Sequence, residues 1–329
     1  MKILVRAPMS EKRLEELKQH FSEVLYDPWN KTGERYYEDE MLAILKQVQP
    51  DILITELDRV SEKVLDGYHG LKVIGDCRAI PANIDVDACT KYGIPILCTP
   101  GRNAQAVAEM LVGLLITYMR NVIPSVQWTL QGKWKTGTTP YFTWMGNELN
   151  GKLVGFVGFG AVGKASAKRL QAFGCKICFY DPYVDNLEKD YKKMELVELF
   201  ANCDIVSIHL PVVESTKHMI NEELLALMKK DSIFINTARS AVVDMKALEK
   251  VAKEKLIKGI ILDVLDNEPP NNQDLALTQY DNVLVTPHIC GATYEVIDHQ
   301  SDIINERLLK WKQGRDLKQI IYNPKVLEG

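Results

Sequence analysis

The sequence contains no dense block of lysine and arginine, and its 329 residues carry a formal net charge of -4. A nucleic-acid surface is therefore not indicated, because binding to a phosphate backbone needs clustered positive charge. Long apolar runs are also missing. The longest, Val107 to Met119, is interrupted by Glu109, which predicts a buried helix and not a membrane span. The apolar start Met1–Val5 is short and meets Arg6, so we expect no signal peptide.

The seven cysteines lack the paired spacing of a metal-ligand set, and we predict no metal site. Cys175 and Cys178 form a Cys-x-x-Cys pattern, but it falls where a strand is predicted to begin. Residues three apart on a strand point to opposite faces, which favours two separate packing thiols over a metal or redox pair. Unpaired cysteines are typical of a reducing compartment, so we expect the protein in the cytoplasm.

An apolar fraction of 46% and this length allow a folded chain of about two domains. Up to residue 98, short apolar runs alternate with helical patterns, which predicts a parallel α/β sheet with helices on both faces. The predicted strands cover 3–5, 24–26, 51–55, 71–76 and 95–98, and the predicted helices cover 10–20, 39–48, 61–68 and 86–92.

The alternation resumes at Gly151 with a spacing typical of a doubly wound dinucleotide-binding fold. The predicted strands are 153–157, 176–180, 204–208, 232–236, 259–263 and 282–285, and the helices are 161–173, 196–202, 221–228 and 244–255. A last helix, 293–313, comes after that fold is complete, so we predict that the chain returns to its first domain. We therefore predict two Rossmann-like α/β domains: a discontinuous, flavodoxin-like outer domain (1–102 and 293–329) for the substrate, and 103–292 for the dinucleotide.

Between these regions the pattern predicts a long helix over 103–123, followed by Pro124. Residues 125–150 look irregular and carry five aromatic residues: Trp128, Trp134, Tyr141, Phe142 and Trp144. These side chains either pack on their own domain or belong to an arm that embraces a second subunit. We favour the arm, since aromatic residues anchor protein interfaces.

A glycine-rich turn forms the most informative stretch. Gly158, Gly160 and Gly163 follow an apolar strand and open a helix, and Asp181 ends the next strand. In this context the first glycine permits a tight turn, the second lets the backbone approach a pyrophosphate, and the third lets helix and strand pack closely. The carboxylate of Asp181 would bind the adenosine ribose hydroxyls and repel a 2′-phosphate, which favours NAD over NADP. A purely structural turn does not account for Asp181.

Three polar residues, Arg239, Glu268 and His288, follow strand-like runs in the second half. Ligands bind at the carboxyl ends of parallel strands, so we expect the three near the nicotinamide. Histidine suits the proton transfer that accompanies hydride transfer to a ketone. A carboxylate beside an imidazole raises the pKa of the ring, and we expect Glu268 to act in this way. The Arg239 guanidinium would grip a carboxylate and polarise a carbonyl, which indicates a 2-hydroxy or 2-oxo acid.

Two further residues have alternative interpretations. His209 competes with His288 as a strand-end histidine, but we interpret the loop of His209, Leu210 and Pro211 as a wall for adenine. Asp263 ends its strand and would accept a hydrogen bond from the nicotinamide amide.

Taken together, the motifs resemble those of the D-isomer-specific 2-hydroxyacid dehydrogenase family, over essentially the whole chain. The resemblance rests on the glycine turn with Asp181 and on Ile208–Pro211, Asn236–Arg239, Asp263–Pro269, Thr286–His288, Asn83–Asp85 and Val107–Glu109. It implies Arg239, Glu268 and His288 as the catalytic trio, and a homodimer built through residues 103–150. It also implies closure of the outer domain over the cleft. The NAD contacts that it implies come from Ala161, Val162, Asp181, His209, Leu210, Pro211, Thr216, Thr237, Ala238 and Asp263. The glycines Gly158, Gly160, Gly163 and Gly291 complete this set.

The sequence departs from the family where the backbone amides of a Gly-x-Gly segment hold the substrate carboxylate. Arg78 and Ile80 replace both glycines, so the substrate-binding segment is predicted to be Arg78, Ala79 and Ile80. The amides of Ala79 and Ile80 remain available for the same task. Either Arg78 binds a dianionic or phosphorylated acid, or it pairs with a neighbouring acid and only shapes the loop.

Two rival functions share this fold. An NAD-sensing corepressor could retain the same trio, but the sequence has no long disordered flanks for partner docking. A formate dehydrogenase needs no proton transfer, so Glu268 beside a histidine weighs against it.

Overall fold

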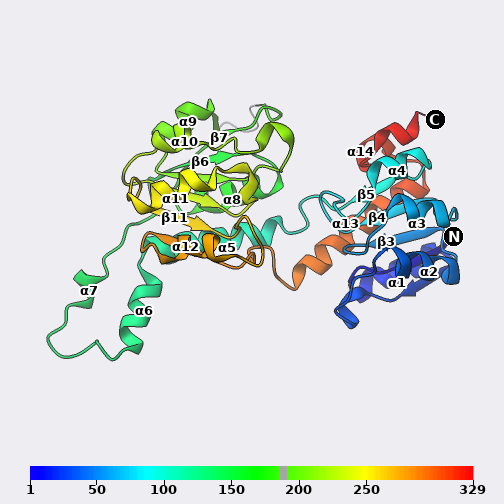
Figure 1. The fold of residues 1–329 in the computed structure, drawn as a ribbon, viewed down its shortest axis with the longest axis horizontal. Coiled ribbons are helices and arrows are strands. Elements are labelled where there is room, and N and C mark those ends of the chain that lie inside the picture. Colours follow the sequence, from blue (N-terminus) through cyan, green and yellow to red (C-terminus); the bar gives the residue numbers. More distant parts are fainter. Residues whose placement is uncertain (186–190, 329) are drawn as a thin grey trace. The chain divides into compact units, whose positions relative to one another are not determined.

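The structure is a computed structural model that describes residues 1–185 and 191–328. The chain divides into two compact units. Unit 1 comprises Met1–Arg102 and Thr293–Gly329, and unit 2 comprises Asn103–Ala292. Each unit is built on one parallel sheet flanked by helices (Figure 1). The two sheets confirm the predicted α/β fold class.

Unit 1 contains a five-stranded parallel sheet in the order β2-β1-β3-β4-β5. This is the flavodoxin-like order, in which the winding reverses between β1 and β3. Its strands are almost continuous apolar runs because helices cover both faces. The strands are β1 (Lys2–Val5), β2 (Glu23–Tyr26), β3 (Ile52–Thr55), β4 (Val73–Asp76) and β5 (Ile96–Cys98).

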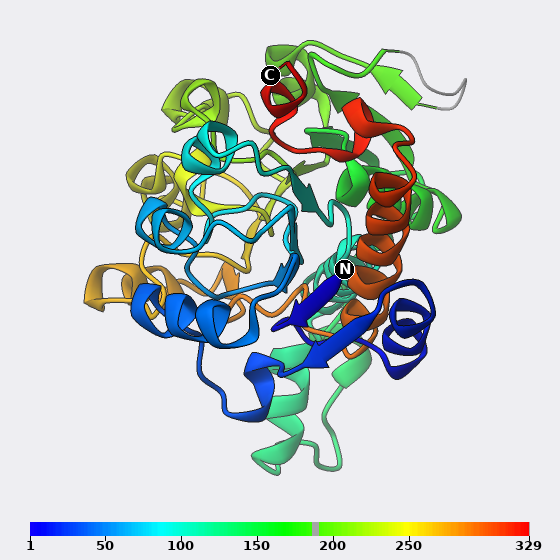
Figure 2. The same cartoon turned by 90° about the vertical axis from the view of Figure 1, so that its right-hand side faces the viewer.

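The helices of unit 1 form two layers. Leu17 of α1 and Ile304 of α13 pack into the core on one face of the sheet, and Leu45 of α2 packs on the other. Figure 2 shows α13 (orange-red) beside α1 (dark blue), so the end of the chain completes the layer that its start begins. The helices are α1 (Glu11–His20), α2 (Glu38–Val48), α3 (Glu62–Gly67), α4 (Val86–Lys91), α13 (Glu295–Lys312) and α14 (Leu317–Ile320).

Unit 2 contains a seven-stranded parallel sheet in the order β12-β11-β10-β9-β6-β7-β8. The winding reverses between β6 and β9, and ligands of such sheets bind outside the carboxyl ends of the strands at that point. The strands are β6 (Leu153–Val157), β7 (Lys176–Tyr180), β8 (Tyr191–Lys193), β9 (Ile205–Ile208), β10 (Ile233–Asn236), β11 (Gly259–Leu262) and β12 (Val283–Val285).

Helices α5 and α8 cover one face of this sheet, and α9 to α11 cover the other. The helices are α5 (Ala104–Met119), α6 (Val122–Leu130), α7 (Pro140–Thr143), α8 (Ala161–Ala172), α9 (Leu196–Asn202), α10 (Glu222–Ala226), α11 (Met245–Lys253) and α12 (Asn272–Ala276). Some of these helices begin after an N-cap side chain. At the start of α11, the Asp244 carboxylate accepts hydrogen bonds from the amides of Lys246 and Ala247.

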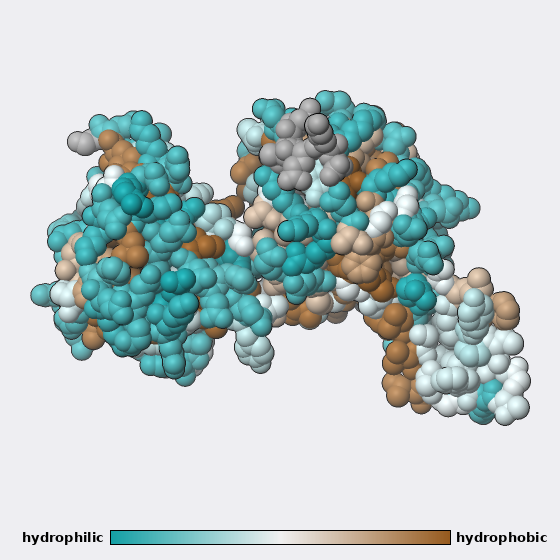
Figure 3. Space-filling model, turned by 180° about the vertical axis from the view of Figure 1, so that it is seen from behind, coloured by the Kyte–Doolittle hydropathy of each residue, from teal (hydrophilic) through white to brown (hydrophobic). Residues whose placement is uncertain are grey.

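The predicted long helix over 103–123 is wrong at its end. Helix α5 stops at Met119, Asn121 adopts a left-handed conformation (φ 53°), and α6 starts at a bend of 62°. Together α6 and α7 project from the rest of unit 2 (Figure 1) and carry apolar side chains at the surface (Figure 3). In the part of the chain that the structure describes, no single helix has the length and apolar character to cross a membrane, although α5 and α6 reach both as a bent pair.

Candidate functional site

The glycine turn connects β6 to α8, and each glycine is needed for a different reason. Gly158 has φ 90°, and a Cβ there would lie 2.7 Å from the carbonyl oxygen of His209. A Cβ at Gly163 would lie 2.8 Å from the carbonyl oxygen of Gly158, so this glycine lets α8 pack against the turn. A Cβ at Gly160 would meet no protein atom within 4 Å. The protein therefore leaves the surface over Gly160 open.

The open surface lies at the start of α8, whose first amides include those of Ala161 and Val162. Gly160 is the N-cap residue, and no side chain caps the helix. The first amides of a helix have no partner within the helix and attract anions. An exposed glycine in front of an uncapped helix fits the pyrophosphate of a dinucleotide.

Asp181 lies just after β7 and is tied to the glycine turn. Its Oδ2 accepts a hydrogen bond from the amide of Phe159 at 2.8 Å, and its Oδ1 accepts one from the amide of Tyr183 at 2.9 Å. Each carboxylate oxygen can accept a second hydrogen bond. The carboxylate is thus fixed beside the turn with acceptor capacity left for ribose hydroxyls.

His209, the competing histidine, follows β9. Its Nε2 lies 2.9 Å from the Oγ of Ser207, and its ring packs against Phe156. Burial lowers the pKa of His209 to about 3, so the ring is neutral at physiological pH. The next loop contains Leu210 and Pro211, and the Thr216 hydroxyl closes it by donating to the Pro211 carbonyl at 2.7 Å.

Arg239 follows β10 in a loop that Asn236 shapes. The Asn236 side chain accepts from the amide of Ala238 at 3.0 Å and donates to the carbonyl of Arg239 at 2.9 Å. The motif contains Asn236, but no sequence pattern indicates this double contact. Arg239 is exposed, and its guanidinium donates a hydrogen bond from Nη1 to the carbonyl of Ala238 at 2.6 Å. Beside it, the Thr237 hydroxyl is buried without a partner among the described residues.

Glu268 and His288 lie in contact although 20 residues separate them in the chain. The Nδ1 of His288 is 2.6 Å from the Oε2 of Glu268, and the side chains are 44% and 41% exposed. Oε1 of Glu268 also accepts from the amide of Leu265 at 3.3 Å. With Nδ1 directed at the carboxylate, Nε2 is the ring nitrogen that can reach a substrate.

Asp263 braces the loop that carries His288. Its buried carboxylate accepts hydrogen bonds from the Thr286 hydroxyl at 2.6 Å and from the amides of Ile289 at 2.9 Å and Cys290 at 2.8 Å. The Asp263 carboxylate is thus already hydrogen-bonded within the protein. The predicted hydrogen bond to the nicotinamide amide is an additional one. Thr286 belongs to the Thr286–His288 motif, but the motif did not indicate that its hydroxyl donates to Asp263. A Cβ at Gly291 would meet the side chain of Asn103 at 2.7 Å, so this glycine lets the loop pass the start of α5.

The predicted substrate segment belongs to unit 1, where it follows β4. Arg78 is half-buried, and Ala79 and Ile80 are exposed. Within the described ranges, the amides of Ala79 and Ile80 donate no hydrogen bond, so both remain free for a ligand. The Arg78 side chain has no ion pair within the described ranges, although its charge acts on the nearby buried Asp76 and partly opposes the rise in the pKa of that carboxyl.

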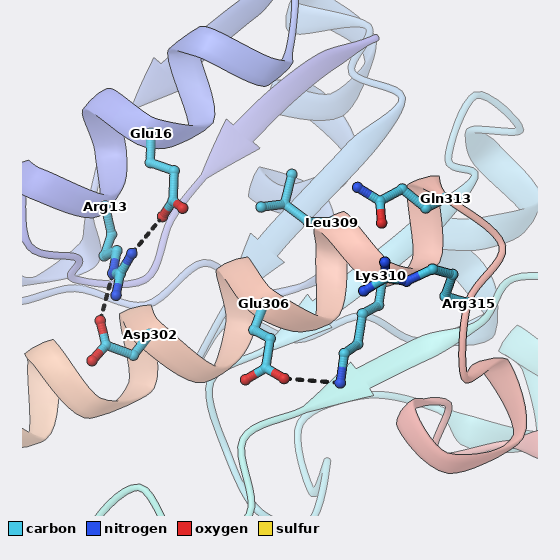
Figure 4. Close-up of a pocket in the computed structure, with 8 residues that line it drawn as sticks. All are labelled: Arg13, Glu16, Asp302, Glu306, Leu309, Lys310, Gln313 and Arg315. Carbon is cyan, nitrogen blue, oxygen red and sulfur yellow. Dashed lines mark hydrogen bonds and ion pairs between the residues drawn. The ribbon is translucent and has the colours of Figure 1, made fainter.

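A surface groove of unit 1 and the acidic, histidine and cysteine side chains of the described chain provide no further candidate site. A surface groove of about 610 Å³ runs between α1 and α13 (Figure 4). Much of its charge is neutralised within it: Arg13 pairs with Glu16 and Asp302, and Lys310 pairs with Glu306. Across residues 1–185 and 191–328, no three His, Cys, Asp or Glu side chains gather as metal ligands.

Comparison with known proteins gives a consistent result. Residues 112–290 match the family model described as "D-isomer specific 2-hydroxyacid dehydrogenase, NAD binding domain". The chain is 46% identical to "Putative 2-hydroxyacid dehydrogenase YoaD" of Bacillus subtilis, over 100% of this chain and 96% of that protein. It is 39% identical to a glyoxylate reductase of Thermofilum pendens, over 82% of this chain and 80% of that protein.

A solved structure extends the likeness to the fold. The acyclic imino acid reductase Bsp5, in complex with NADPH and D-Arg, matches with a TM-score of 0.80 at 25% identity, over 98% of this chain and 99% of that one. The family model and the turn geometry agree that unit 2 carries an NAD-binding domain, and the predicted cofactor, NAD(H), is confirmed.

Proposed function

This chain belongs to the D-isomer-specific 2-hydroxyacid dehydrogenase family, and we propose that it reduces a small 2-oxo acid to the D-2-hydroxy acid, or catalyses the reverse reaction. The observation that carries this proposal is the contact of 2.6 Å between His288 and Glu268 on the NAD-binding unit. Bound NADH supplies the hydride to C2 of the acid. The protein must then bind the acid, orient it and move one proton.

His288 is the proton donor in the direction of reduction. Its Nδ1 faces Glu268, so Nε2 delivers the proton to the oxygen on C2, and recovers it when the hydroxy acid is oxidised. Glu268 fixes the orientation of the ring, because its Oε2 lies 2.6 Å from Nδ1 and leaves Nε2 directed at the substrate. His209 is half-buried and neutral, and it is unsuited to this task.

Arg239 and the segment after β4 bind the acid. The Arg239 guanidinium uses one donor on the Ala238 carbonyl and keeps the others for the substrate carboxylate and carbonyl. Donors aimed at the carbonyl oxygen stabilise the charge that develops there as hydride arrives. The free amides of Ala79 and Ile80 are the second carboxylate ligands in this proposal.

Unit 2 holds the dinucleotide. The turn from Gly158 to Gly163 receives the pyrophosphate, and Asp181 receives the adenosine ribose hydroxyls and disfavours a 2′-phosphate. The loop of Leu210, Pro211 and Thr216 lies along adenine. Thr237, Ala238 and Asp263 border the nicotinamide, with Gly291 in the same loop as His288.

We also propose that the protein is a homodimer assembled through α6 and α7. The support is the large apolar surface on this arm: Leu130 is 82% exposed, Tyr141 78% and Phe142 70%. Apolar patches of this kind are rare on monomers. The free cysteines of the described chain fit a reducing compartment, which supports the cytoplasm as the proposed location.

The proposal is tested by NADH oxidation with glyoxylate, hydroxypyruvate, pyruvate, a branched 2-oxo acid, 2-oxoglutarate and phosphohydroxypyruvate. We expect turnover of at least one of these acids. If NADH binds and none is reduced, the enzyme assignment fails and an NAD-sensing, corepressor-like protein becomes the better account.

A further inference from the structure

A cavity of about 350 Å³ in unit 1 is lined by three arginine side chains. Arg35 comes from the segment before α2, Arg59 from the loop after β3, and Arg78 from the loop after β4. Tyr37 and Asn83 complete the polar lining. Three guanidinium groups around one cavity repel one another unless an anion lies between them.

None of these arginines has a carboxylate within ion-pair distance in the described parts of the chain. Arg35 donates to the hydroxyl of Tyr37 at 3.0 Å, and Arg59 makes a long contact of 3.4 Å with the carbonyl of Ala82. The Arg78 side chain makes no hydrogen bond with residues 1–185 or 191–328. Most of their donors are therefore free.

The nearby carboxyl groups are engaged elsewhere. Asp58 accepts from the Tyr36 amide at 2.7 Å and contacts buried Arg6. Glu56 pairs with Arg102 at 2.5 Å. The Asp76 carboxyl is fully buried, and burial raises its pKa to about 8, so it is mostly uncharged at neutral pH. These carboxyl groups therefore do not neutralise the positive charge of the cavity.

Asn83 joins two of the loops that line the cavity. It is only 8% exposed, and its Nδ2 donates to the Asp58 carbonyl at 3.0 Å. This hydrogen bond holds the loop after β4, which carries Arg78, against the loop after β3, which carries Arg59.

We propose that Arg35, Arg59 and Arg78 form a subsite for a second anionic group, a carboxylate or a phosphate, on the 2-oxo acid. The proposal rests on the proposed function and names its substrate class. Arg78 directly precedes Ala79 and Ile80, whose free amides are assigned to the 2-oxo carboxylate. The two sets of donors are therefore adjacent in the chain, which points to a dianionic 2-oxo acid with a short chain between its two charges.

The test compares kcat/KM for matched pairs in NADH oxidation: 2-oxoglutarate against 2-oxopentanoate, and phosphohydroxypyruvate against hydroxypyruvate. The wild-type protein should prefer the dianion in at least one pair, and the preferred pair tells carboxylate from phosphate. In Arg35→Gln and Arg59→Gln the ratio of dianion to monoanion kcat/KM should fall about 10- to 100-fold, as expected for a lost charge-assisted hydrogen bond. Arg315→Gln, a change in the other groove of unit 1, is the matched control and should leave the ratio unchanged.

A preference for monoanions in the wild type, or a ratio that the two variants do not change, overturns the subsite and leaves the proposed function standing. If no acid is reduced, the proposed function fails, and phosphate binding decides the subsite by itself. Inorganic phosphate should then raise Tm with saturation in the wild type and in Arg315→Gln, and much less in Arg35→Gln and Arg59→Gln. A rise that is absent, or equal in all four proteins, refutes the subsite.

Discussion

Two histidines of unit 2 follow strands, yet their surroundings give them different chemistry. His209 is enclosed beside Phe156 and has a pKa of about 3, whereas His288 is part-exposed and faces Glu268. The order of motifs in the sequence favoured His288, but the contact with Glu268 depends on how two loops fold together. Burial and loop geometry are tertiary properties that no local pattern contains.

Replacing His288 with asparagine should lower kcat for reduction by about 10²- to 10⁴-fold, because the proton donor is lost. The Kd for NADH, measured by fluorescence, should change little, since the glycine turn and Asp181 are intact. Loss of NADH binding in His288→Asn would show that this side chain holds the cofactor and not the proton. Glu268→Gln should also lower kcat, because the carboxylate that orients the His288 ring is lost.

Asp76 predicts a pH effect on stability. Burial raises its pKa from the ordinary 3.8 of an aspartate to about 8, so the folded state holds an extra proton between these limits. The free energy of unfolding therefore loses a contribution as pH rises toward 8. In Asp76→Asn that loss should vanish, so the variant should gain stability relative to wild type between pH 5 and pH 8.5 in denaturant titrations.

An exposed aspartate of α4, Asp87, gives the matched control for this measurement. Asp87→Asn should show no such gain on going to high pH. Parallel pH curves for Asp76→Asn and the wild type would mean that Asp76 is charged in the folded protein.

Elements of regular structure were predictable where apolar periodicity is strong, as in the strands of both units. The exceptions have physical causes. The predicted helix over 103–123 is divided because a continuous helix would place Pro124 in its interior, where it lacks an amide proton and clashes with the preceding turn. Restarting at Val122 puts Pro124 in the first turn of α6. Strand β8 was missed because Tyr191–Lys193 is a short edge strand with two lysines and no apolar run.

Two glycines of the turn have different roles: the fold requires Gly158, and ligand binding is expected to require Gly160. Gly158→Ala should lower the free energy of unfolding by about 1–3 kcal/mol, since its φ is positive and its Cβ would strike the carbonyl of His209. Gly160→Ala should leave it within about 0.5 kcal/mol, because nothing in the protein opposes the new Cβ. Yet Gly160→Ala should weaken NADH binding at least about tenfold, or about 1.4 kcal/mol. Unaltered NADH affinity in Gly160→Ala would place the pyrophosphate elsewhere.

The arm of α6 and α7 gives a prediction about assembly. The double change Leu130→Lys and Phe142→Lys should convert a dimer into monomers in sedimentation velocity, because both side chains are exposed apolar groups of the proposed interface. Val197→Lys on α9 is the control, since Val197 is 59% exposed outside the arm. A wild-type protein that sediments as a monomer, or a double variant that stays dimeric, would refute this interface.

Both units of the molecule share one architecture, in which a parallel sheet lies between two layers of helices. In both, the loops of the proposed site follow the carboxyl ends of the strands. The alternating pattern made this class predictable, and the spaced motifs made the family recognisable. No sequence pattern predicted that three arginine side chains of unit 1 lie together without a carboxylate partner among the described residues. Arg35, Arg59 and Arg78 are far apart in sequence, and only the fold brings them to one cavity.

The measurement that tests the central claim most directly is the configuration of the product. The best 2-oxo acid should be reduced with NADH and the product separated by chiral chromatography. We expect stoichiometric oxidation of NADH and the D-2-hydroxy acid as the product, with His288→Asn reducing the rate of its formation. Formation of the L-isomer, or binding of NADH without any product, would contradict the assignment of this chain as a D-specific 2-hydroxyacid dehydrogenase.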